Sequence, residues 1–160
     1  MGRKGTVIEV CVSARKGERK TPVGQGRLVA GHGLEGDAHA GTGRQVSLLC
    51  EVSARKVRER GLDVGPGDFA ENLLVDGLGP DDFAVGSRVR IAGGGADALL
   101  EVTQIGKECH ADCAIREQTG DCVMPREGIF ARVVRGGAVR AGDALEVCDG
   151  TQGGDPGDQR

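Results

Sequence analysis

The chain has 160 residues, enough for one domain with a hydrophobic core of its own. Aromatic residues make up 2% of it, and Trp and Tyr are absent, so we expect no platform on which the bases of single-stranded nucleic acid could stack. The formal net charge is -3 with both signs interspersed, which excludes a basic stripe for a duplex backbone. The composition therefore predicts no nucleic-acid partner.

The N-terminal sequence MGRKGTVIEVCVSARKG contains an apolar run that is too short and too interrupted for a signal peptide or a membrane span. We therefore expect a cytoplasmic protein with no membrane partner. In a reducing compartment its six cysteines should remain thiols, and a cysteine cluster there more often binds a metal or reacts than forms a disulfide framework.

Short β-branched runs alternate with glycine-rich connections along the chain. They predict strands over residues 6–13, 26–30, 44–50, 73–75, 87–92, 99–105, 130–135 and 144–147. In the third run, Val46, Leu48 and Cys50 share one face of the strand. Ser47 and Leu49 share the opposite face. Many short strands of this kind favour a mainly β, barrel-like fold with a few short helices over a βαβ sheet.

Two helices are expected among these strands. The first covers residues 51–60, places Val52 and Val57 on one flank, and ends at Gly61. The second, over residues 109–118, begins at a cysteine. Both are short, as the mainly β pattern requires.

The C-terminal part of the chain contains a predicted turn and a predicted tail. Gly136-Gly137 predicts a tight turn between strands. Residues 149–160 contain no apolar side chain, so we expect a disordered tail there. Residues 1–148 are then expected to form a single domain.

The stretch from Cys109 to Gly137 carries most of the thiol chemistry. At a helix start, free backbone N–H groups and the helix dipole would stabilise a Cys109 thiolate, and Lys107 and His110 act in the same direction. Three interpretations stay open for the cysteines at 109, 113 and 122. They can be small buried residues, or a structural zinc site whose spacing differs from paired C-x2-C motifs. The third interpretation is a reactive or metal-ligating thiolate at Cys109.

A second polar island surrounds Asp37 and His39. On an extended segment these two side chains face the same side, and a carboxylate beside an imidazole can fix its tautomer for proton transfer or ligation. A surface turn with chance polar residues is the alternative interpretation. Arg44, Gln45 and Ser47 follow directly and can bind an anion.

Two further groups complete the candidates. Glu71 and Asn72 enter a predicted strand, where such a pair can cap a turn or hold a ligand hydroxyl. Near the cysteines, Arg116, Arg126 and Arg132 add forked donors suited to phosphate or carboxylate.

These islands, in this order, resemble the MOSC family, named after the C-terminal domain of molybdenum cofactor sulfurases. The resemblance spans about residues 5–148. The matching segments are Gly33-Leu-Glu-Gly-Asp-Ala-His39, Arg44-Gln-Val-Ser47, Glu71-Asn72, Gly86, Cys109, Gly128-Ile-Phe-Ala-Arg-Val133, Gly136-Gly137 and Gly142-Asp143. The wording around Cys109 and Cys113 is similar to that of short stand-alone bacterial members.

The resemblance implies a β-barrel-like fold that binds molybdenum cofactor (molybdopterin) or molybdate. It also implies that Cys109 corresponds to the family cysteine, which is proposed to act as a sulfur carrier or to ligate molybdenum. Molybdopterin-processing enzymes are the partners that it suggests. Pyridoxal phosphate is implied only as a family association. No Lys in this sequence stands in a context that identifies a Schiff-base site.

Our leading hypothesis is a protein that handles the metal or its sulfur through Cys109 during cofactor maturation or delivery. Asp37 and His39 are placed in the catalytic site with Cys109, which is also the expected metal ligand. The residues expected to hold the cofactor are Arg44, Ser47, Glu71, Asn72 and Arg132. Two alternatives remain: a molybdenum-dependent reductase of N-hydroxylated compounds with a partner electron donor, and a non-catalytic, zinc-stabilised binding module.

Overall fold

The structure is a computed structural model that describes residues 2–15, 18–61, 63–92, 97–106 and 127–148. The helix expected over 109–118 and the tail expected over 149–160 lie outside these residues. The described strands are β1 (Arg3–Val12), β2 (Thr21–Pro22), β3 (Gln25–Val29), β4 (Gly33–Leu34), β5 (Val46–Cys50), β6 (Leu73–Asp76), β7 (Arg88–Ala92), β8 (Ala98–Ile105), β9 (Ile129–Arg135), β10 (Gly137–Arg140) and β11 (Ala144–Cys148). The described helices are α1 (Glu51–Arg58) and the 3-10 turn η1 (Pro80–Asp82).

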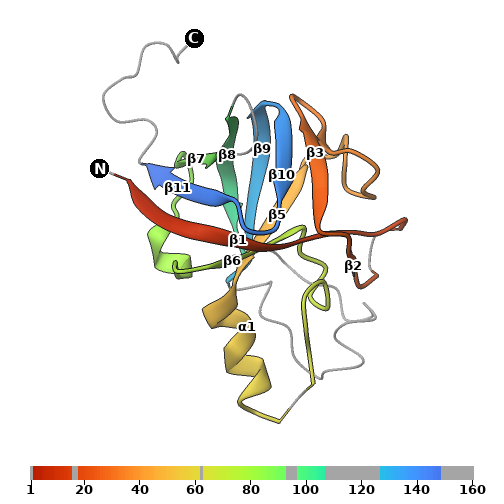
Figure 1. Cartoon of the computed structure of the whole chain (residues 1–160), viewed down its shortest axis with the longest axis vertical. Coiled ribbons are helices and arrows are strands. Elements are labelled where there is room, and N and C mark those ends of the chain that lie inside the picture. The colour runs from red at the N-terminus through yellow and green to blue at the C-terminus, as the bar shows by residue number, and fades with distance from the viewer. Residues whose placement is uncertain (1, 16–17, 62, 93–96, 107–126, 149–160) are drawn as a thin grey trace.

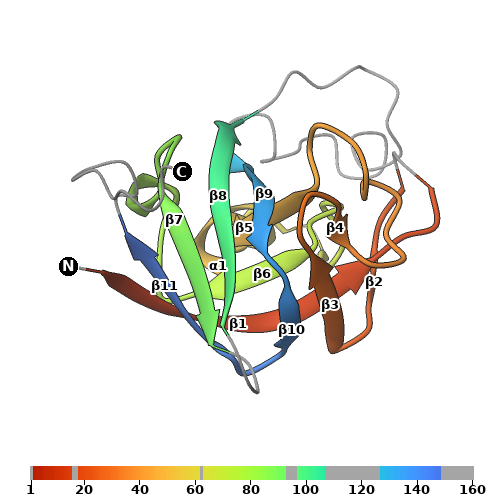
Figure 2. The ribbon, with the colours of Figure 1, turned by 90° about the horizontal axis from the view of Figure 1, so that it is seen from above.

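Seven strands close into a barrel, in the order β1-β11-β7-β8-β9-β5-β6 and back to β1, and β2 extends β1 at its end (Figures 1 and 2). The mainly β, barrel-like prediction is confirmed. β5 and β6 pair in parallel through the α1 crossover, and the other pairings between described strands are antiparallel. Register shifts in the β1–β6 and β8–β9 ladders mark bulges, which bend strands enough for a sheet to close.

Two apolar clusters stabilise the barrel, one inside it and one against its outer surface. The larger one fills the interior with aliphatic side chains from every barrel strand. The smaller one lies outside, between the barrel and α1, and consists of Leu49, Ala54, Val57, Val64, Phe69, Leu74 and Phe130. β5 is buried on both faces, and its alternation is as predicted: Val46, Leu48 and Cys50 belong to the interior cluster, and Leu49 belongs to the outer one.

The helix α1 is shorter than the predicted span of 51–60, because Glu59 forms its cap and Gly61 takes a left-handed φ of 94°. The prediction that Val52 and Val57 share a flank is wrong. Val57 is fully buried, whereas Val52 is 38% exposed. Residues five positions apart are turned by about 140° around a helix, so they cannot share one narrow face.

The tight turn predicted at Gly136-Gly137 is also wrong. The strand β9 instead runs on into β10, which leaves the barrel sheet and pairs with β3 in a three-stranded sheet with β4 (Figure 2). A Cβ at position 136 would lie 2.5 Å from the carbonyl oxygen of Leu28. Glycine is needed there because two backbones pass in close contact.

No helix in the described part of the chain is long and apolar enough to cross a membrane.

Candidate functional site

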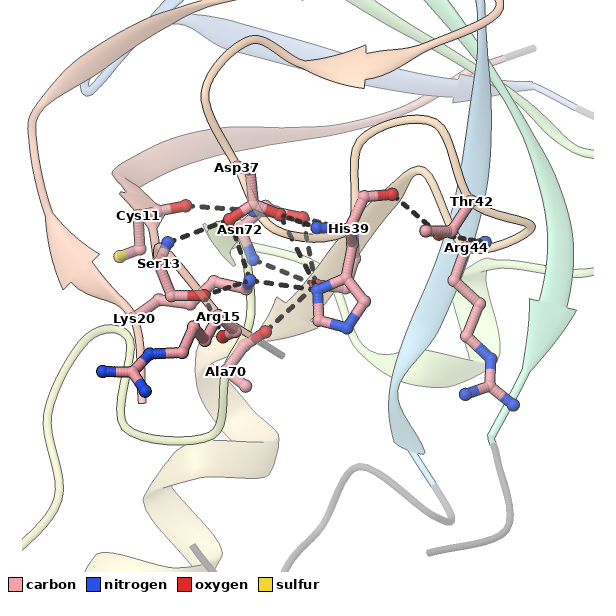
Figure 3. Close-up of polar contacts among 11 residues, drawn as sticks. Cys11, Ser13, Arg15, Lys20, Asp37, His39, Thr42, Arg44, Ala70 and Asn72 are labelled. Atoms are coloured by element: carbon pink, nitrogen blue, oxygen red, sulfur yellow. Dashed lines mark hydrogen bonds and ion pairs between the residues drawn. The ribbon is translucent and has the colours of Figure 1, made fainter. Parts of the chain in front are cut away.

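Two loops meet beside the barrel and bring a lysine, an aspartate and a histidine into contact. Ser13 directly follows β1, and Lys20 directly precedes β2. Asp37 and His39 lie on the folded loop between β4 and β5. Figure 3 shows the Lys20 amine at the centre, facing Ser13, Asp37 and His39. We call these four residues the lysine cluster.

The Asp37 carboxylate is surrounded by donors. Its Oδ1 accepts from the Lys20 amine at 2.8 Å and from the Ser13 backbone N–H at 3.0 Å. Its Oδ2 accepts from the His39 backbone N–H at 3.0 Å. Burial acts to raise the pKa of Asp37, but the contacts with His39, Lys20 and the two backbone N–H groups outweigh it and hold that pKa below its ordinary range. Asp37 therefore stays ionised in the folded protein at neutral pH.

The Lys20 side chain is fully buried, as is the Asp37 side chain with which it pairs. Besides Asp37, its amine contacts the Ser13 hydroxyl at 3.1 Å and the His39 Nδ1 at 3.2 Å. A buried cation without such partners would be strongly destabilising. The cluster therefore holds a compensated pair of charges in a dry environment.

His39 and Arg44 lie on the open side of the cluster. The His39 side chain is 23% exposed, and Arg44 is partly exposed. The Thr42 hydroxyl ties them together, because it donates to the His39 carbonyl at 2.7 Å and accepts from the Arg44 backbone N–H at 3.1 Å. The two side chains extend to the same side of the loop (Figure 3). They form a pair of polar groups aimed in one direction.

The Arg44 guanidinium is positioned by two weak contacts. It lies over the Phe130 ring at 5.5 Å from the centroid, and its Nε is 3.4 Å from the Gln104 side-chain oxygen. Neither Nη atom has a hydrogen-bond partner among the described residues. A forked guanidinium end of this kind suits a carboxylate or phosphate.

Ser47 and Asn72 form a separate, fully internal network. Asn72 Oδ1 accepts from the Ser47 backbone N–H at 2.9 Å, and Asn72 Nδ2 donates to the Cys11 carbonyl at 3.0 Å. The Ser47 hydroxyl is 3.3 Å from the Ala70 carbonyl oxygen, and Ala70 has a left-handed φ of 65°. Ser47 and Asn72 are buried and bind the protein's own backbone. Their contact with a cofactor stays a prediction.

Glu71 is buried and caps a turn. Its carboxylate accepts from the backbone N–H groups of Gly67 at 2.7 Å and Phe69 at 3.2 Å. The turn lies against Lys20, whose N–H donates to the Gly67 carbonyl at 2.8 Å. A Cβ on Gly67 would lie 2.0 Å from the Lys20 carbonyl oxygen, so the turn requires glycine. Glu71 thus supports the lysine cluster through backbone contacts, and its predicted contact with a cofactor is untested.

Burial raises the pKa of Glu71 to about 7, although hydrogen bonds from the Gly67 and Phe69 N–H groups act to lower it.

Arg132, the last predicted cofactor ligand, lies on β9. Its Nε donates to the Glu101 side chain of β8 at 2.8 Å, and half of the Arg132 side chain is exposed.

The buried thiols in the described part of the chain are not activated. Burial is the main cause that raises the pKa of Cys11 far above its ordinary value, and it raises the pKa of Cys50 to about 12. Cys109, the predicted catalytic and metal-ligating thiol, lies outside the described residues, as do Cys113 and Cys122. Among the described residues, no three His, Cys, Asp or Glu side chains lie close enough together to hold a metal ion.

The structure brings Asp37 and His39 into contact and places Arg44 on the same loop. It adds Lys20 and Ser13, which sequence reasoning missed. Lys20 ends the charged segment Arg15-Lys-Gly-Glu-Arg-Lys20, a composition typical of a solvated loop. No local pattern distinguishes it from the basic residues beside it. Its burial depends on residues that are distant in the sequence.

The molecule is thus a closed β-barrel with a buried lysine–aspartate pair beside two more exposed polar side chains, His39 and Arg44. Residues 35–146 match the family model of the MOSC domain, so the chain belongs to the MOSC family. That family is associated with molybdenum cofactor binding or sulfurase-like function. A comparison with curated proteins found no match.

Solved structures share the fold. The YuaD protein from Bacillus subtilis is 19% identical with a TM-score of 0.72, and the match covers 92% of this chain and 98% of that one. YiiM from Geobacillus stearothermophilus is 23% identical with a TM-score of 0.68, covering 89% of this chain and 74% of that one. YiiM from Escherichia coli is 24% identical with a TM-score of 0.63, covering 89% and 69%.

Proposed function

We propose that this chain binds an anionic molybdenum species, molybdenum cofactor or molybdate, beside the loop of His39 and Arg44. Cys109 then handles the metal or its sulfur during cofactor maturation or delivery. The observation that carries the proposal is the pair of partly exposed polar side chains on one loop, His39 and Arg44, beside the buried Lys20–Asp37 ion pair. Membership of the MOSC family supports the choice of molybdenum.

The donor chemistry fits an oxyanion better than a bare cation. Arg44 offers a forked guanidinium end without a partner among the described residues, suited to a phosphate or an oxometalate. No cluster of carboxylates, thiols and imidazoles that could hold a cation occurs in the described ranges. In this proposal a soft metal is bound by the Cys109 thiolate or keeps the ligands that it brings with it.

Each described residue has a defined task in this proposal. Arg44 binds the anionic group, and His39 contacts it from the same loop. Lys20 and Asp37 orient His39 and exclude water behind it. A bound pterin cofactor supplies a metal held by soft sulfur ligands, which accepts a further thiolate or sulfur. Cys109 contributes that thiolate.

The test is elemental analysis of protein purified from a molybdenum-replete host. Wild type, Cys109→Ala and Arg44→Met are compared with Arg27→Met, which removes an exposed arginine from β3 and serves as the matched control. We expect molybdenum in wild type and Arg27→Met, and a loss of at least tenfold in Arg44→Met and Cys109→Ala.

Full molybdenum occupancy in Cys109→Ala would overturn the thiolate role. A persulfide on Cys109 in purified protein supports sulfur transfer rather than metal ligation. Stoichiometric zinc, with unfolding on chelation, would instead establish the zinc-stabilised binding module. Reduction of N-hydroxylated substrates by the loaded protein with an electron donor would establish the reductase.

A further inference from the structure

The hydrogen bonds of the lysine cluster can be counted atom by atom. The ammonium group of Lys20 has three N–H donors and no acceptor. In the described part of the chain, three atoms lie within hydrogen-bond distance of it: Ser13 Oγ at 3.1 Å, Asp37 Oδ1 at 2.8 Å and His39 Nδ1 at 3.2 Å. Because the side chain is fully buried, water does not replace any of these partners.

Each of the three contacts has a direction. The Ser13 hydroxyl donates its own hydrogen to the Arg15 carbonyl at 3.0 Å, so its oxygen accepts from Lys20. The ionised Asp37 can accept but not donate. The third N–H of Lys20 is then left for His39 Nδ1. This ring nitrogen can accept a hydrogen bond only when it carries no proton.

The Asp37 carboxylate lies farther from this ring nitrogen than the Lys20 amine does. Asp37 Oδ2 is 3.7 Å from His39 Nδ1, which is beyond hydrogen-bond distance. Its Oδ2 is already used by the His39 backbone N–H. A proton on Nδ1 would face the Lys20 ammonium donor-to-donor at 3.2 Å. The ring proton therefore belongs on Nε2, at the open edge.

We propose that Lys20 is a positioning residue that fixes His39 as its Nε2–H tautomer, so that the open edge of the ring is a hydrogen-bond donor. His39 then serves as a donor to an oxyanion and does not ligate a metal, because Nδ1 is occupied by Lys20 and Nε2 carries the proton. The choice of an oxyanion rests on the proposed function, whereas the tautomer rests on the geometry of the cluster.

This assignment changes the role that a carboxylate–imidazole pair usually has. In such a pair the carboxylate accepts from one ring nitrogen and leaves the other as an acceptor or ligand. Here a cation takes the place of the carboxylate. The inner nitrogen, Nδ1, is then the acceptor, and the outer nitrogen, Nε2, is the donor. The His39 donor and the Arg44 guanidinium then present donors to the same side of the loop (Figure 3).

The tautomer is measured directly by long-range ¹H–¹⁵N correlation spectra of ¹⁵N-histidine-labelled protein at neutral pH. The chain has three histidines, and the signals of His39 are assigned by their loss in His39→Gln. We expect Nδ1 to resonate as an unprotonated ring nitrogen and Nε2 as a protonated one. A proton on Nδ1 of the folded wild type would overturn the proposal.

Variants separate positioning from folding. Ser13→Ala keeps the contact between Lys20 and His39, so the Nε2–H tautomer should persist. In Lys20→Met/Asp37→Asn both members of the buried charge pair are neutralised, which avoids leaving one charge alone. His39 should then populate both tautomers. An unchanged, pure Nε2–H tautomer in the double variant would show that Lys20 does not fix it.

The ligand class is tested with two probes on the same labelled protein. Molybdate, with sulfate as a second oxyanion, should shift the Nε2–H proton signal of His39, and Zn²⁺ should leave it in place. Loss of that proton on equimolar Zn²⁺ would contradict the donor role. Failure of the proposed function is distinguishable, because purified protein without molybdenum can still show the Nε2–H tautomer.

Discussion

Two buried carboxylates of this protein, Asp37 and Glu71, have opposite electrostatics. Both side chains are excluded from solvent, and both accept two backbone N–H hydrogen bonds. The pKa of Asp37 lies below its ordinary range, whereas burial raises the pKa of Glu71 to about 7. The difference lies in the side chains around the two groups: His39 and the Lys20 amine, at 2.8 Å, both lower the pKa of Asp37, and no cation contacts Glu71 among the described residues.

The comparison shows that backbone hydrogen bonds alone do not offset the burial of a carboxylate in this fold. A buried charge needs a counter-charge or gains a proton. The same distinction separates two tasks. The paired Asp37 stays charged and organises the cluster beside the candidate site, while Glu71 supports the turn that carries Gly67 and contacts the Lys20 backbone.

The largest effect is expected from Lys20→Met, which leaves Asp37 buried without its cation. The free energy of unfolding should fall by roughly 3–5 kcal/mol, because one charge of a buried pair is left uncompensated. Urea denaturation monitored by circular dichroism measures it. The exposed Lys4→Met is the matched control and should change stability by less than about 0.5 kcal/mol. Equal effects of the two variants would remove the electrostatic basis of the comparison.

The pH dependence of stability should have opposite signs at the two carboxylates. Between an ordinary pKa of 4.5 and about 7, folded Glu71 holds a proton that the unfolded chain has lost. Its contribution is therefore fully present below pH 4.5 and is lost as the pH rises to 7, by about 3 kcal/mol. Glu71→Gln should abolish this decline, as measured by unfolding at several pH values.

Asp37 gives the reverse sign. Its folded pKa is lowered from an ordinary 3.8, so its contribution is present above that value and is lost as the pH falls further. A decline between pH 4.5 and 7 that persists in Glu71→Gln would assign it to another group.

The sequence predicted the parts of this molecule that depend on local patterns. Alternation in β5 predicts which side chains enter the barrel, since the two faces of a strand repeat every second residue. Loop residues Asp37, His39 and Arg44 were recognisable as a polar island and do lie together. The helix between β5 and β6 was predicted, but the parallel β5–β6 pairing was not, because the short strand at residues 73–75 does not reveal its partner.

The missed features depend on contacts between distant segments. β2 and β4 have two residues each, too few for any periodicity. Lys20 is buried because the loop of Asp37 and the turn of Gly67 enclose it, and no residue near Lys20 indicates this. A buried ion pair is a property of tertiary structure, so composition around either partner cannot reveal it.

Two glycines, one beside each carboxylate, test whether the turn of Glu71 is held close to the backbone of Lys20. Gly36, beside Asp37, and Gly67, in the Glu71 turn, both have φ of 85°. Gly36→Ala should lower stability by about 1 kcal/mol, the cost of a left-handed alanine, because nothing lies within 4 Å of the new Cβ. Gly67→Ala should cost roughly 2–3 kcal/mol, since its Cβ meets the Lys20 carbonyl at 2.0 Å. Equal losses in thermal unfolding would show that the turn does not hold Lys20.

The smallest effect is expected where an ion pair is exposed. Arg132 and Glu101 pair across β9 and β8 with half of the Arg132 side chain in solvent, so Arg132→Met should cost less than about 1 kcal/mol. This small cost makes the variant informative about ligand binding. If Arg132 also holds the cofactor, as the sequence predicts, molybdenum content falls in Arg132→Met while the unfolding midpoint hardly moves. Unchanged content would leave Arg44 as the guanidinium that binds the anion, next to the lysine cluster.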